Sequence, residues 1–223
     1  MTVFCSSSSC IDGAYTRAAT DLGAALAYSG RTLVYGGGRL GLMGELSKSW
    51  RRAGGRVEGV ITELLREAEQ MDTENDENTV VATMRERKAL MEERGDAFVI
   101  LPGGLGTLEE FTEILVGRLL GEHDKPIIIV NTLEPGTDED DDERGFYDPL
   151  LTLFTHMIER RFAKPGMTDL FDVVPDARGV LEAIERHERE PVAIGDRTSL
   201  MPGLPGGHGD SGHGNGGHES GDR

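Results

Sequence analysis

The stretch Ala97-Phe-Val-Ile-Leu-Pro-Gly-Gly-Leu-Gly-Thr-Leu-Glu-Glu-Phe111 runs from apolar residues through a glycine-rich turn into the start of a helix. Its first part, Ala97–Leu101, is short, wholly apolar and followed by Pro-Gly, which is typical of a strand buried on both faces. Beyond Thr107 the apolar residues recur at helical spacing. A buried strand followed at once by a helix indicates one unit of an α/β fold.

The same alternation continues along the chain from Met1 to about Glu190. Short β-branched or apolar runs predict strands at Thr2–Cys5, Thr32–Tyr35, Arg56–Ile61, Thr79–Ala82, Ala97–Leu101, Pro126–Val130 and Asp172–Val174. Helical patterning lies between most of them, at Gly13–Ser29, Leu40–Ala53, Met84–Arg94, Thr107–Leu120, Tyr147–Arg160 and Asp176–His187. Such alternation predicts a doubly wound parallel α/β sheet with right-handed crossovers. Ligands in these sheets bind beyond the carboxyl ends of the strands, so we expect the functional residues there.

The charge of the chain bears on its partners. Its 223 residues include 40 acidic and 23 basic side chains, a net charge of −17. A general nucleic-acid binder needs the opposite sign, and anionic membrane surfaces repel this charge. The longest apolar runs, Ala97–Leu101 and Ile127–Val130, fall far short of the roughly 20 residues that span a bilayer. We therefore expect neither nucleic acid nor membrane as a partner.

Lysine is scarce within this acidic composition, occurring only at Lys48, Lys88, Lys125 and Lys164. An excess of acid with few lysines favours a host cytoplasm rich in salt, because screening removes the self-repulsion of the chain. An ordinary acidic protein is the alternative.

The compartment is predicted from the start of the chain and from its cysteines. Met1 is followed by neither the basic region nor the apolar core of a signal peptide, which favours a cytoplasmic protein. Cys5 and Cys10 fit no zinc spacing and could not staple a large fold. A reduced compartment is the simple interpretation.

Composition divides the chain into one folded domain, residues 1–190, and a Gly/His-rich acidic tail, residues 191–223. From about residue 202 the tail lacks aromatic and β-branched residues, which predicts disorder. His208, His213 and His218 recur there and could bind a metal, although a solvated tail is the simpler interpretation. The acidic run Asp138–Glu143 is predicted to be a solvated loop.

The loop Gly103–Gly106 follows the most apolar strand and clears space for a ligand, since glycine lets a main chain approach closely. Thr107 is predicted to be the N-cap of the next helix, with Glu110 at capping-box distance. Glu110 is then either part of the cap or a functional carboxylate. Glu109 and Glu110 lie beside a loop suited to phosphate, where a carboxylate could stabilise positive charge at a sugar carbon.

A second glycine-rich loop, Gly36–Gly44, follows the strand at Thr32–Tyr35. Gly36, Gly38 and Gly41 match G-x-G-x-x-G, and Glu58 lies about twenty residues further on, which invites a dinucleotide-binding interpretation. The motif follows the second strand rather than the first, and Glu58 lies inside a strand, so the match is weak evidence and a structural turn is the alternative. Two such loops at neighbouring strand ends favour one phosphate site.

The helix predicted at Met84–Arg94 brings basic groups to the same edge of the sheet. Arg87 is either a clamp for phosphate or substrate, or a surface ion-pair partner of a neighbouring glutamate. Met84 and Met91 are predicted to be core residues.

With these three motifs the chain resembles the LOG ("Lonely Guy") family of cytokinin riboside 5′-monophosphate phosphoribohydrolases. The resemblance is carried by Gly-Gly-Gly-Arg-Leu-Gly-Leu-Met-Gly44, Met84-Arg-Glu-Arg-Lys88 and Pro102-Gly-Gly-Leu-Gly-Thr-Leu-Glu-Glu110. The opening Val3–Ser8, Tyr15, Val60-Ile61 and Lys125-Pro126 are also similar to the family, and the resemblance covers about residues 1–185.

The resemblance implies a Rossmann-like fold with helices on both faces of the sheet. It implies hydrolysis of a purine nucleoside 5′-monophosphate, either an N6-modified AMP or AMP, to free base and ribose 5-phosphate. Arg87 and Glu110 would be catalytic, with no metal or organic cofactor, in a homodimer or larger homo-oligomer. We expect the substrate or its phosphate to contact Gly36, Gly37, Gly38, Glu69, Lys88, Gly103, Gly104, Leu105, Gly106, Thr107, Leu108 and Glu109.

Three positions depart from the family pattern. Arg85 stands where the family often has His, Thr62 where it usually has Pro, and Ser6 where it commonly has Gly. None removes the pair of Arg87 and Glu110, but Arg85 and Thr62 bear on the selectivity for the base.

Three other functions remain open at this point. A non-catalytic carrier of a nucleotide or of the molybdenum cofactor has the same scaffold, with less need of Arg87 and Glu110. A nicotinamide-dependent oxidoreductase would rest on Gly36–Gly41. A lysine decarboxylase needs a lysine that forms a Schiff base with pyridoxal phosphate, and Lys88 is the only lysine within the motifs.

Overall fold

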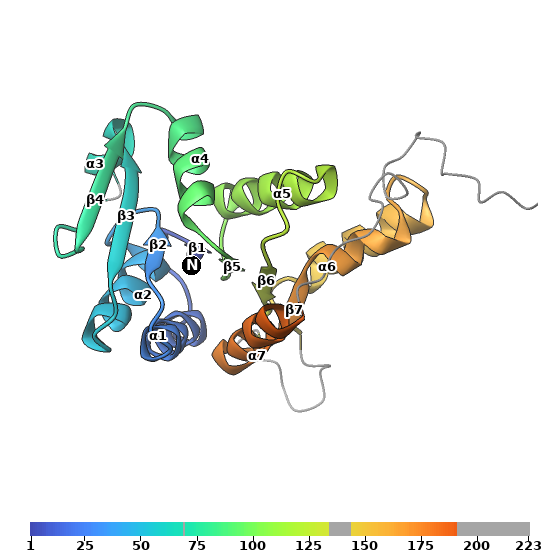
Figure 1. Cartoon of the computed structure of the whole chain (residues 1–223), viewed down its shortest axis with the longest axis horizontal. Coiled ribbons are helices and arrows are strands. Elements are labelled where there is room, and N and C mark those ends of the chain that lie inside the picture. The colour runs from blue at the N-terminus through green and yellow to red at the C-terminus, as the bar shows by residue number, and fades with distance from the viewer. Residues whose placement is uncertain (69, 134–143, 191–223) are drawn as a thin grey trace, which may run out of the picture.

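Seven parallel strands form one sheet in a computed structural model that describes residues 1–68, 70–133 and 144–190. The strands are β1 (Thr2–Phe4), β2 (Leu33–Tyr35), β3 (Val57–Thr62), β4 (Glu77–Val81), β5 (Phe98–Ile100), β6 (Ile127–Val130) and β7 (Asp172–Val174). Their order across the sheet is β4-β3-β2-β1-β5-β6-β7 (Figure 1). The predicted parallel α/β sheet is confirmed.

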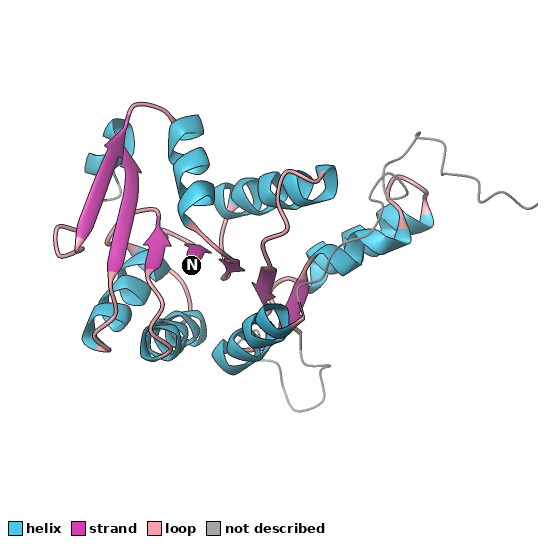
Figure 2. Ribbon diagram, in the orientation of Figure 1, coloured by secondary structure: helices cyan, strands magenta, loops and turns pink. Residues whose placement is uncertain are grey.

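Helices connect the strands. They are α1 (Gly13–Tyr28), α2 (Gly41–Arg52), α3 (Glu63–Ala68), α4 (Met84–Arg94), α5 (Leu105–Leu120), α6 (Asp148–Glu159) and α7 (Ala177–Arg189), with a short 3-10 helix η1 (Pro165–Leu170) before β7. Both faces of the sheet are covered (Figure 2): α1, α2 and α7 pack on one face, and α4, α5 and α6 on the other.

Alternation along the buried strands divides the core between the two faces. Val3 and Val99 belong to the cluster under α1, α2 and α7, whereas Phe4 and Ile100, the next residue in each strand, belong to the cluster under α4, α5 and α6. Successive side chains of a strand point to opposite faces, so a strand buried on both sides is apolar throughout. This accounts for the unbroken apolar run that marked β5 in the sequence.

Trp50 belongs to the cluster under α1, α2 and α7 and is fully buried. Its indole Nε1 donates to the main-chain carbonyl of Arg31 at 3.2 Å, so its one polar atom is satisfied. Gly55 packs against the ring, and a Cβ there would lie 2.4 Å from Cδ1 of Trp50.

The strand order changes direction between β1 and β5. The chain builds outward from β1 through β2 and β3 to β4, then returns to pair β5 with the free side of β1. The carboxyl ends of β1 and β5 therefore border the crevice where doubly wound sheets bind their ligands.

Two details of the predicted elements are wrong. The helix α5 begins at Leu105, two residues before the predicted start, and its N-cap is Gly104 rather than Thr107. Leu105 and Gly106 are already helical, so Thr107 lies inside the first turn and Glu110 is no part of a cap. The helix α3 was missed because none of its residues is buried, and apolar periodicity gives no signal there.

The prediction that Met84 and Met91 are core residues is half right. Met91 is 1% exposed, but Met84, the first residue of α4, is 40% exposed. Within the described ranges, no helix combines the length and apolar character needed to cross a bilayer. Glu69, the acidic run Asp138–Glu143 and the tail 191–223 lie outside the described residues.

Candidate active site

A cavity of about 340 Å³ opens where β1, β2 and β5 end, between the first turns of α4 and α5. It is lined by Val3, Phe4, Cys5, Ser6, Ser7, Ser8, Gly36, Met43, Arg87, Met91, Gly104, Leu105, Gly106, Thr107 and Glu110. The two glycine-rich loops and the basic helix of the sequence motifs thus meet at one place, next to the change in strand order.

Arg87 extends from α4 into this cavity and is almost completely buried, with 6% of its side chain exposed. Its Nε donates to the carbonyl of Val60 at 3.0 Å, and its Nη2 donates to the carbonyl of Gly36 at 3.1 Å. The carbonyl of Gly36 lies directly after β2, and that of Val60 lies within β3. Two neighbouring strands therefore hold the guanidinium in one orientation. Arg87 is therefore not the surface ion-pair partner of a neighbouring glutamate.

Glu110 lies in the second turn of α5, with 10% of its side chain exposed. Its Oε1 is 3.8 Å from Nη1 of Arg87, which leaves the pair in contact and still open to the cavity. A buried carboxylate beside a fixed guanidinium can stabilise positive charge that develops on a ligand, or can orient a water molecule.

The first turn of α5 borders the same cavity. Its N-cap Gly104 offers no side chain, so the free amides of this turn have no side-chain acceptor. A Cβ at Gly104 or at Gly106 would meet nothing within 4 Å, and neither residue has a positive φ. The protein itself therefore does not require glycine at these two positions. Glycine there leaves room for an anionic group to reach the amides.

The loop after β2 is built differently. The amides of Leu42 and Met43 at the start of α2 both donate to the carbonyl of Ser6, at 2.9 and 3.4 Å. Gly41 has φ +57°, and a Cβ there would lie 2.4 Å from the carbonyl oxygen of Ser8. Gly41 is thus explained by a turn and close packing, and the first amides of α2 already have an acceptor within the protein, which weakens the support for a dinucleotide at this helix.

Glu58, the acidic partner expected of a dinucleotide fingerprint, is also engaged elsewhere. Its carboxylate pairs with Arg56 at 2.9 Å and with Arg94 at 3.4 Å. It does not line the cavity.

The structure brings part of the predicted substrate contacts together with Arg87 and Glu110. Those that line the cavity are Gly36, Gly104, Leu105, Gly106 and Thr107. Those that do not are Gly37, Gly38, Lys88, Gly103, Leu108 and Glu109. Gly103 borders an adjoining apolar pocket, and Leu108 packs against the core under α4, α5 and α6.

Lys88 and Glu109, both predicted to touch the substrate, pair with each other. The ammonium of Lys88 also pairs with Glu113 at 2.9 Å. Burial lowers the pKa of Lys88, but its hydrogen bonds to Glu109 and Glu113 more than offset this and raise it above the usual value. The charged lysine therefore links α4 to α5 beside the cavity.

Some lining residues were missed as site candidates. Ser6, Ser7 and Ser8 follow β1 directly, so their position at a strand end was the signal that could have found them. A smaller pocket of about 220 Å³ adjoins the cavity through Ser6 and Gly104. It is lined mainly by apolar side chains, among them Ile11, Tyr15, Leu42, Pro102 and Phe146. Among the described residues, no three His, Cys, Asp or Glu side chains are grouped so that they could hold a metal ion.

Comparison with known proteins agrees with these motifs. A family model described as "Possible lysine decarboxylase" matches residues 43–184. LOG5 of Arabidopsis thaliana, named cytokinin riboside 5′-monophosphate phosphoribohydrolase, is 39% identical over 186 residues, covering 83% of this chain and 77% of the relative. The chain belongs to the LOG family. A second LOG relative, LOGL9 of Oryza sativa subsp. japonica, named a probable enzyme of the same activity, is 40% identical over 185 residues, 83% of this chain and 77% of the relative.

Solved structures with the same fold include molybdenum-cofactor proteins. The Moco carrier protein of Chlamydomonas reinhardtii has a TM-score of 0.61 and 21% identity, covering 85% of this chain and 96% of its own. The molybdenum cofactor binding protein of Rippkaea orientalis has a TM-score of 0.60 and 20% identity, covering 82% of this chain and 93% of its own. At this identity the similarity shows the fold that this LOG chain shares with them.

The decarboxylase description does not fit the site of this LOG chain. Pyridoxal phosphate chemistry needs a lysine within reach of the cofactor. No lysine lines the cavity, and Lys88 is held by two carboxylates outside it.

Proposed function

We propose that this chain hydrolyses the N-glycosidic bond of a purine nucleoside 5′-monophosphate to free base and ribose 5-phosphate. The observation that carries the proposal is the placement of the buried Arg87–Glu110 pair beside the open first turn of α5 in one cavity. The names of the LOG relatives support the same reaction.

The proposed mechanism uses both halves of the cavity. The 5′-phosphate binds the amides of Leu105, Gly106 and Thr107 at the start of α5, where the helix dipole favours an anion. Glu110 then lies beside the ribose, where its carboxylate stabilises the oxocarbenium-like transition state or orients the attacking water. Arg87 orients Glu110 and the sugar.

The bond changes follow from this arrangement. The bond between C1′ and the purine nitrogen breaks, and its electron pair leaves with the base. Water then supplies a hydroxyl group to C1′ and a proton to the base. The chemistry requires only a carboxylate, a cation and water, so we propose that no organic cofactor or metal takes part.

Substrate selectivity is the finer part of the proposal. We expect an N6-modified AMP or AMP, and we expect Arg85 and Thr62 to influence the choice. Arg85 is exposed on the first turn of α4, next to Met84, whose sulfur lies 4.0 Å from Nη1 of Arg87. Thr62 is buried and accepts a hydrogen bond from the amide of Leu65 at the start of α3.

We also propose a homodimer in a salt-rich cytoplasm. Val116, Leu120 and Leu153 are each about half exposed on α5 and α6, which supports a partner surface on this side of the sheet. The net charge of −17 and the scarcity of lysine support the salt-rich host. Light scattering during size-exclusion chromatography at low and high salt measures the oligomeric state directly.

We assign the catalytic domain to residues 1–190 and propose that the tail 191–223 is not needed for catalysis. The residues that line the cavity, from Val3 to Glu110, all lie within that domain. A chain ending after Glu190 should therefore keep the rate of the full chain.

The deciding experiment incubates the protein with AMP and with N6-isopentenyl-AMP at low and high salt, and measures free base by chromatography. Base release that falls at least about a hundredfold in Glu110→Gln, with the fold retained, would support the hydrolase. A folded protein that binds nucleotide without releasing base would be a carrier instead.

A further inference from the structure

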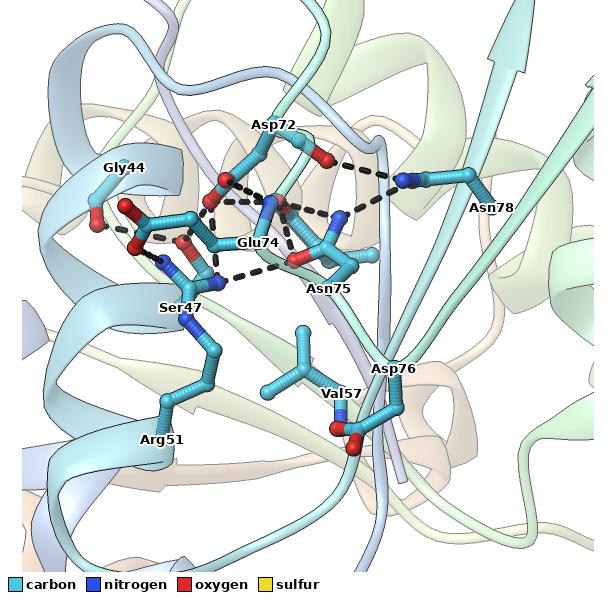
Figure 3. Close-up of polar contacts among 10 residues, drawn as sticks. Gly44, Ser47, Arg51, Val57, Asp72, Glu74, Asn75, Asp76 and Asn78 are labelled. Atoms are coloured by element: carbon cyan, nitrogen blue, oxygen red, sulfur yellow. Dashed lines mark hydrogen bonds and ion pairs between the residues drawn. The ribbon is translucent and has the colours of Figure 1, made fainter.

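Asp72 is a buried carboxylate outside the cavity, 5% exposed, in the segment between α3 and β4. Figure 3 shows polar side chains of α2 and of the segment after Asp72 converging on it. Its Oδ2 accepts hydrogen bonds from Ser47 Oγ at 3.0 Å and from Nη1 of Arg51 at 2.9 Å. Its Oδ1 accepts from the amide of Glu74 at 3.0 Å. A buried carboxylate needs such partners, and here they come from α2 and from its own segment.

The cluster around Asp72 also includes Tyr35 and Asn75. The Tyr35 hydroxyl lies 3.5 Å from Oδ2 of Asp72 and accepts from Nδ2 of Asn75 at 3.0 Å. Oδ1 of Asn75 accepts from Arg51 at 2.9 Å. Burial raises the pKa of Tyr35, so its hydroxyl stays protonated as a donor. We call these five residues, Tyr35, Ser47, Arg51, Asp72 and Asn75, the Asp72 cluster.

The same segment pairs with the glycine-rich loop after β2. The amide of Asp72 donates to the carbonyl of Gly37 at 2.8 Å, and the amide of Arg39 donates to the carbonyl of Gln70 at 3.1 Å. Between these bonds Gly38 forms an antiparallel bridge with Met71. The loop is thus fixed along three successive residues.

This pairing reaches the candidate active site through one peptide unit. The carbonyl of Gly36, the residue before Gly37, accepts a hydrogen bond from Nη2 of Arg87 at 3.1 Å. Gly37 has φ +76°, a conformation that glycine adopts without strain, and the three consecutive glycines bring no side chains to hold the loop. The position of the Gly36 carbonyl therefore depends on what contacts the loop from outside. Strand β3 packs against Gly37 on one side, and the Asp72 segment binds the loop through the hydrogen bonds of Gly37 and Arg39.

We propose that Asp72 is a positioning residue for Arg87, acting through Gly37 and Gly36. This inference rests on the proposed function for its kinetic effect. With the cluster intact, the Gly36 carbonyl meets the guanidinium where Nη1 faces Glu110. Without the Asp72 carboxylate, Ser47 and Arg51 no longer anchor the segment, the loop moves, and Arg87 loses its orientation while the first turn of α5 stays intact.

Asp72→Asn tests this because it removes the charge and changes little in shape. We expect kcat for base release to fall between about ten- and a hundredfold, because small displacements of an orienting group have large effects on rate. We expect KM to stay within about twofold, because the phosphate site on α5 is untouched. A rise in KM with unchanged kcat would overturn the proposal.

Asp172→Asn is a matched control. Asp172 pairs with Arg186 and His187 and so links β7 to α7, and it does not line the cavity. Like Asp72, Asp172 is a carboxylate that pairs with an arginine and with a second side chain. Its replacement by Asn should nevertheless leave kcat at the wild-type value. Equal falls in kcat for the two variants would mean general destabilisation and would overturn the proposal.

A double-mutant cycle separates positioning from stability. If Asp72 acts through Arg87, Asp72→Asn should change kcat less than about twofold in an Arg87→Lys background. Effects that multiply in full would show that Asp72 acts independently of Arg87 and would overturn the proposal. Should Asp72→Asn fail to fold, Ser47→Ala removes a single donor to the same carboxylate and should lower kcat by about threefold in the same direction.

The NMR signal of the Arg87 Nε–H group tests the positioning role without measuring turnover, so its result does not depend on the proposed function. The Nε–H of Arg87 donates to Val60 inside the protein, so its ¹H–¹⁵N signal should be resolved and should vanish in Arg87→Lys. Asp72→Asn should shift and broaden that signal, whereas Asp172→Asn should leave it unchanged. If wild-type protein releases no base, the proposed function fails and this signal alone decides. An unchanged Arg87 signal in Asp72→Asn overturns the positioning role.

Discussion

A Cβ atom on Gly36 would lie 2.1 Å from Nη2 of Arg87, because the guanidinium packs directly on the main chain at the end of β2. No side chain fits between them, and the hydrogen bond from Nη2 to the Gly36 carbonyl depends on this contact. The buried guanidinium of Arg87 can occupy this position because the residue directly after β2, Gly36, has no side chain.

Gly36→Ala should therefore act on Arg87 rather than on the backbone of residue 36, whose φ is not positive. The added methyl group would displace the guanidinium, and we expect base release to slow at least about a hundredfold. Gly13→Ala is the matched control, since a Cβ there meets only the flexible end of Arg17 at 3.3 Å. Both rates are measured by chromatography of the free base. A wild-type rate in Gly36→Ala would refute this role for Arg87.

Gly106→Ala should separate folding from ligand binding. Alanine inside a helix is more stable than glycine by about 0.5–1 kcal/mol, and a Cβ at this position meets nothing in the protein. We expect the unfolding temperature to stay the same or rise, while the Kd for AMP rises at least about tenfold because the methyl group occupies the space meant for phosphate. Calorimetry with AMP and with adenosine measures this in a Glu110→Gln background, in which AMP is not turned over, and the affinity for adenosine should not change. Equal losses for the two ligands would place the phosphate elsewhere.

His123 should make stability depend on pH. Burial lowers the pKa of His123, although its hydrogen bond to the carbonyl of Ile114 opposes this in part. Near pH 6.5 His123 binds a proton in the unfolded chain but not in the folded chain. The free energy of unfolding therefore decreases as the pH falls below about 6.5 toward the lowered pKa of the folded state. His123→Gln should flatten the loss of stability between about pH 7.5 and 5.5. Urea unfolding followed by circular dichroism at constant ionic strength measures the slope. Identical slopes for wild type and variant would contradict the assignment.

Salt should stabilise the protein. The net charge of −17 repels itself at low ionic strength, whereas exposed ion pairs such as Arg178–Glu182 contribute little that screening could remove. We expect the unfolding temperature to rise steadily from about 0.1 to about 2 M KCl, with activity following. Differential scanning calorimetry over this range checks it. A maximum at low salt would contradict the salt-adapted interpretation.

Much of the fold was predictable because strands buried on both faces leave continuous apolar runs, as in β5 and β6. Gly104 and Gly106 could likewise be placed at the site, since they follow such a strand at its carboxyl end. The missed helix α3 has no buried residue, so no periodic pattern marked it.

Other features of the candidate site could not be read from one sequence. Arg87 and Lys88 are adjacent, but neighbouring side chains on a helix point about 100° apart, and only Arg87 reaches the cavity. The partners of Arg87 are the main-chain carbonyls of Gly36 and Val60, and because every residue carries such a carbonyl, the sequence does not single out these two as its acceptors. Asp72 sits in a polar segment whose composition is that of a solvated loop, although its carboxylate is buried.

The burial of Trp50 determines what ultraviolet emission from this protein can report. It is the only tryptophan of the chain, it is shielded from water, and it is absent from the cavity lining. Its emission should shift to longer wavelength only when the core under α1 and α2 opens, and should stay constant while a nucleotide is titrated. The fluorescence of Trp50 therefore reports unfolding and does not change when a ligand binds in the cavity.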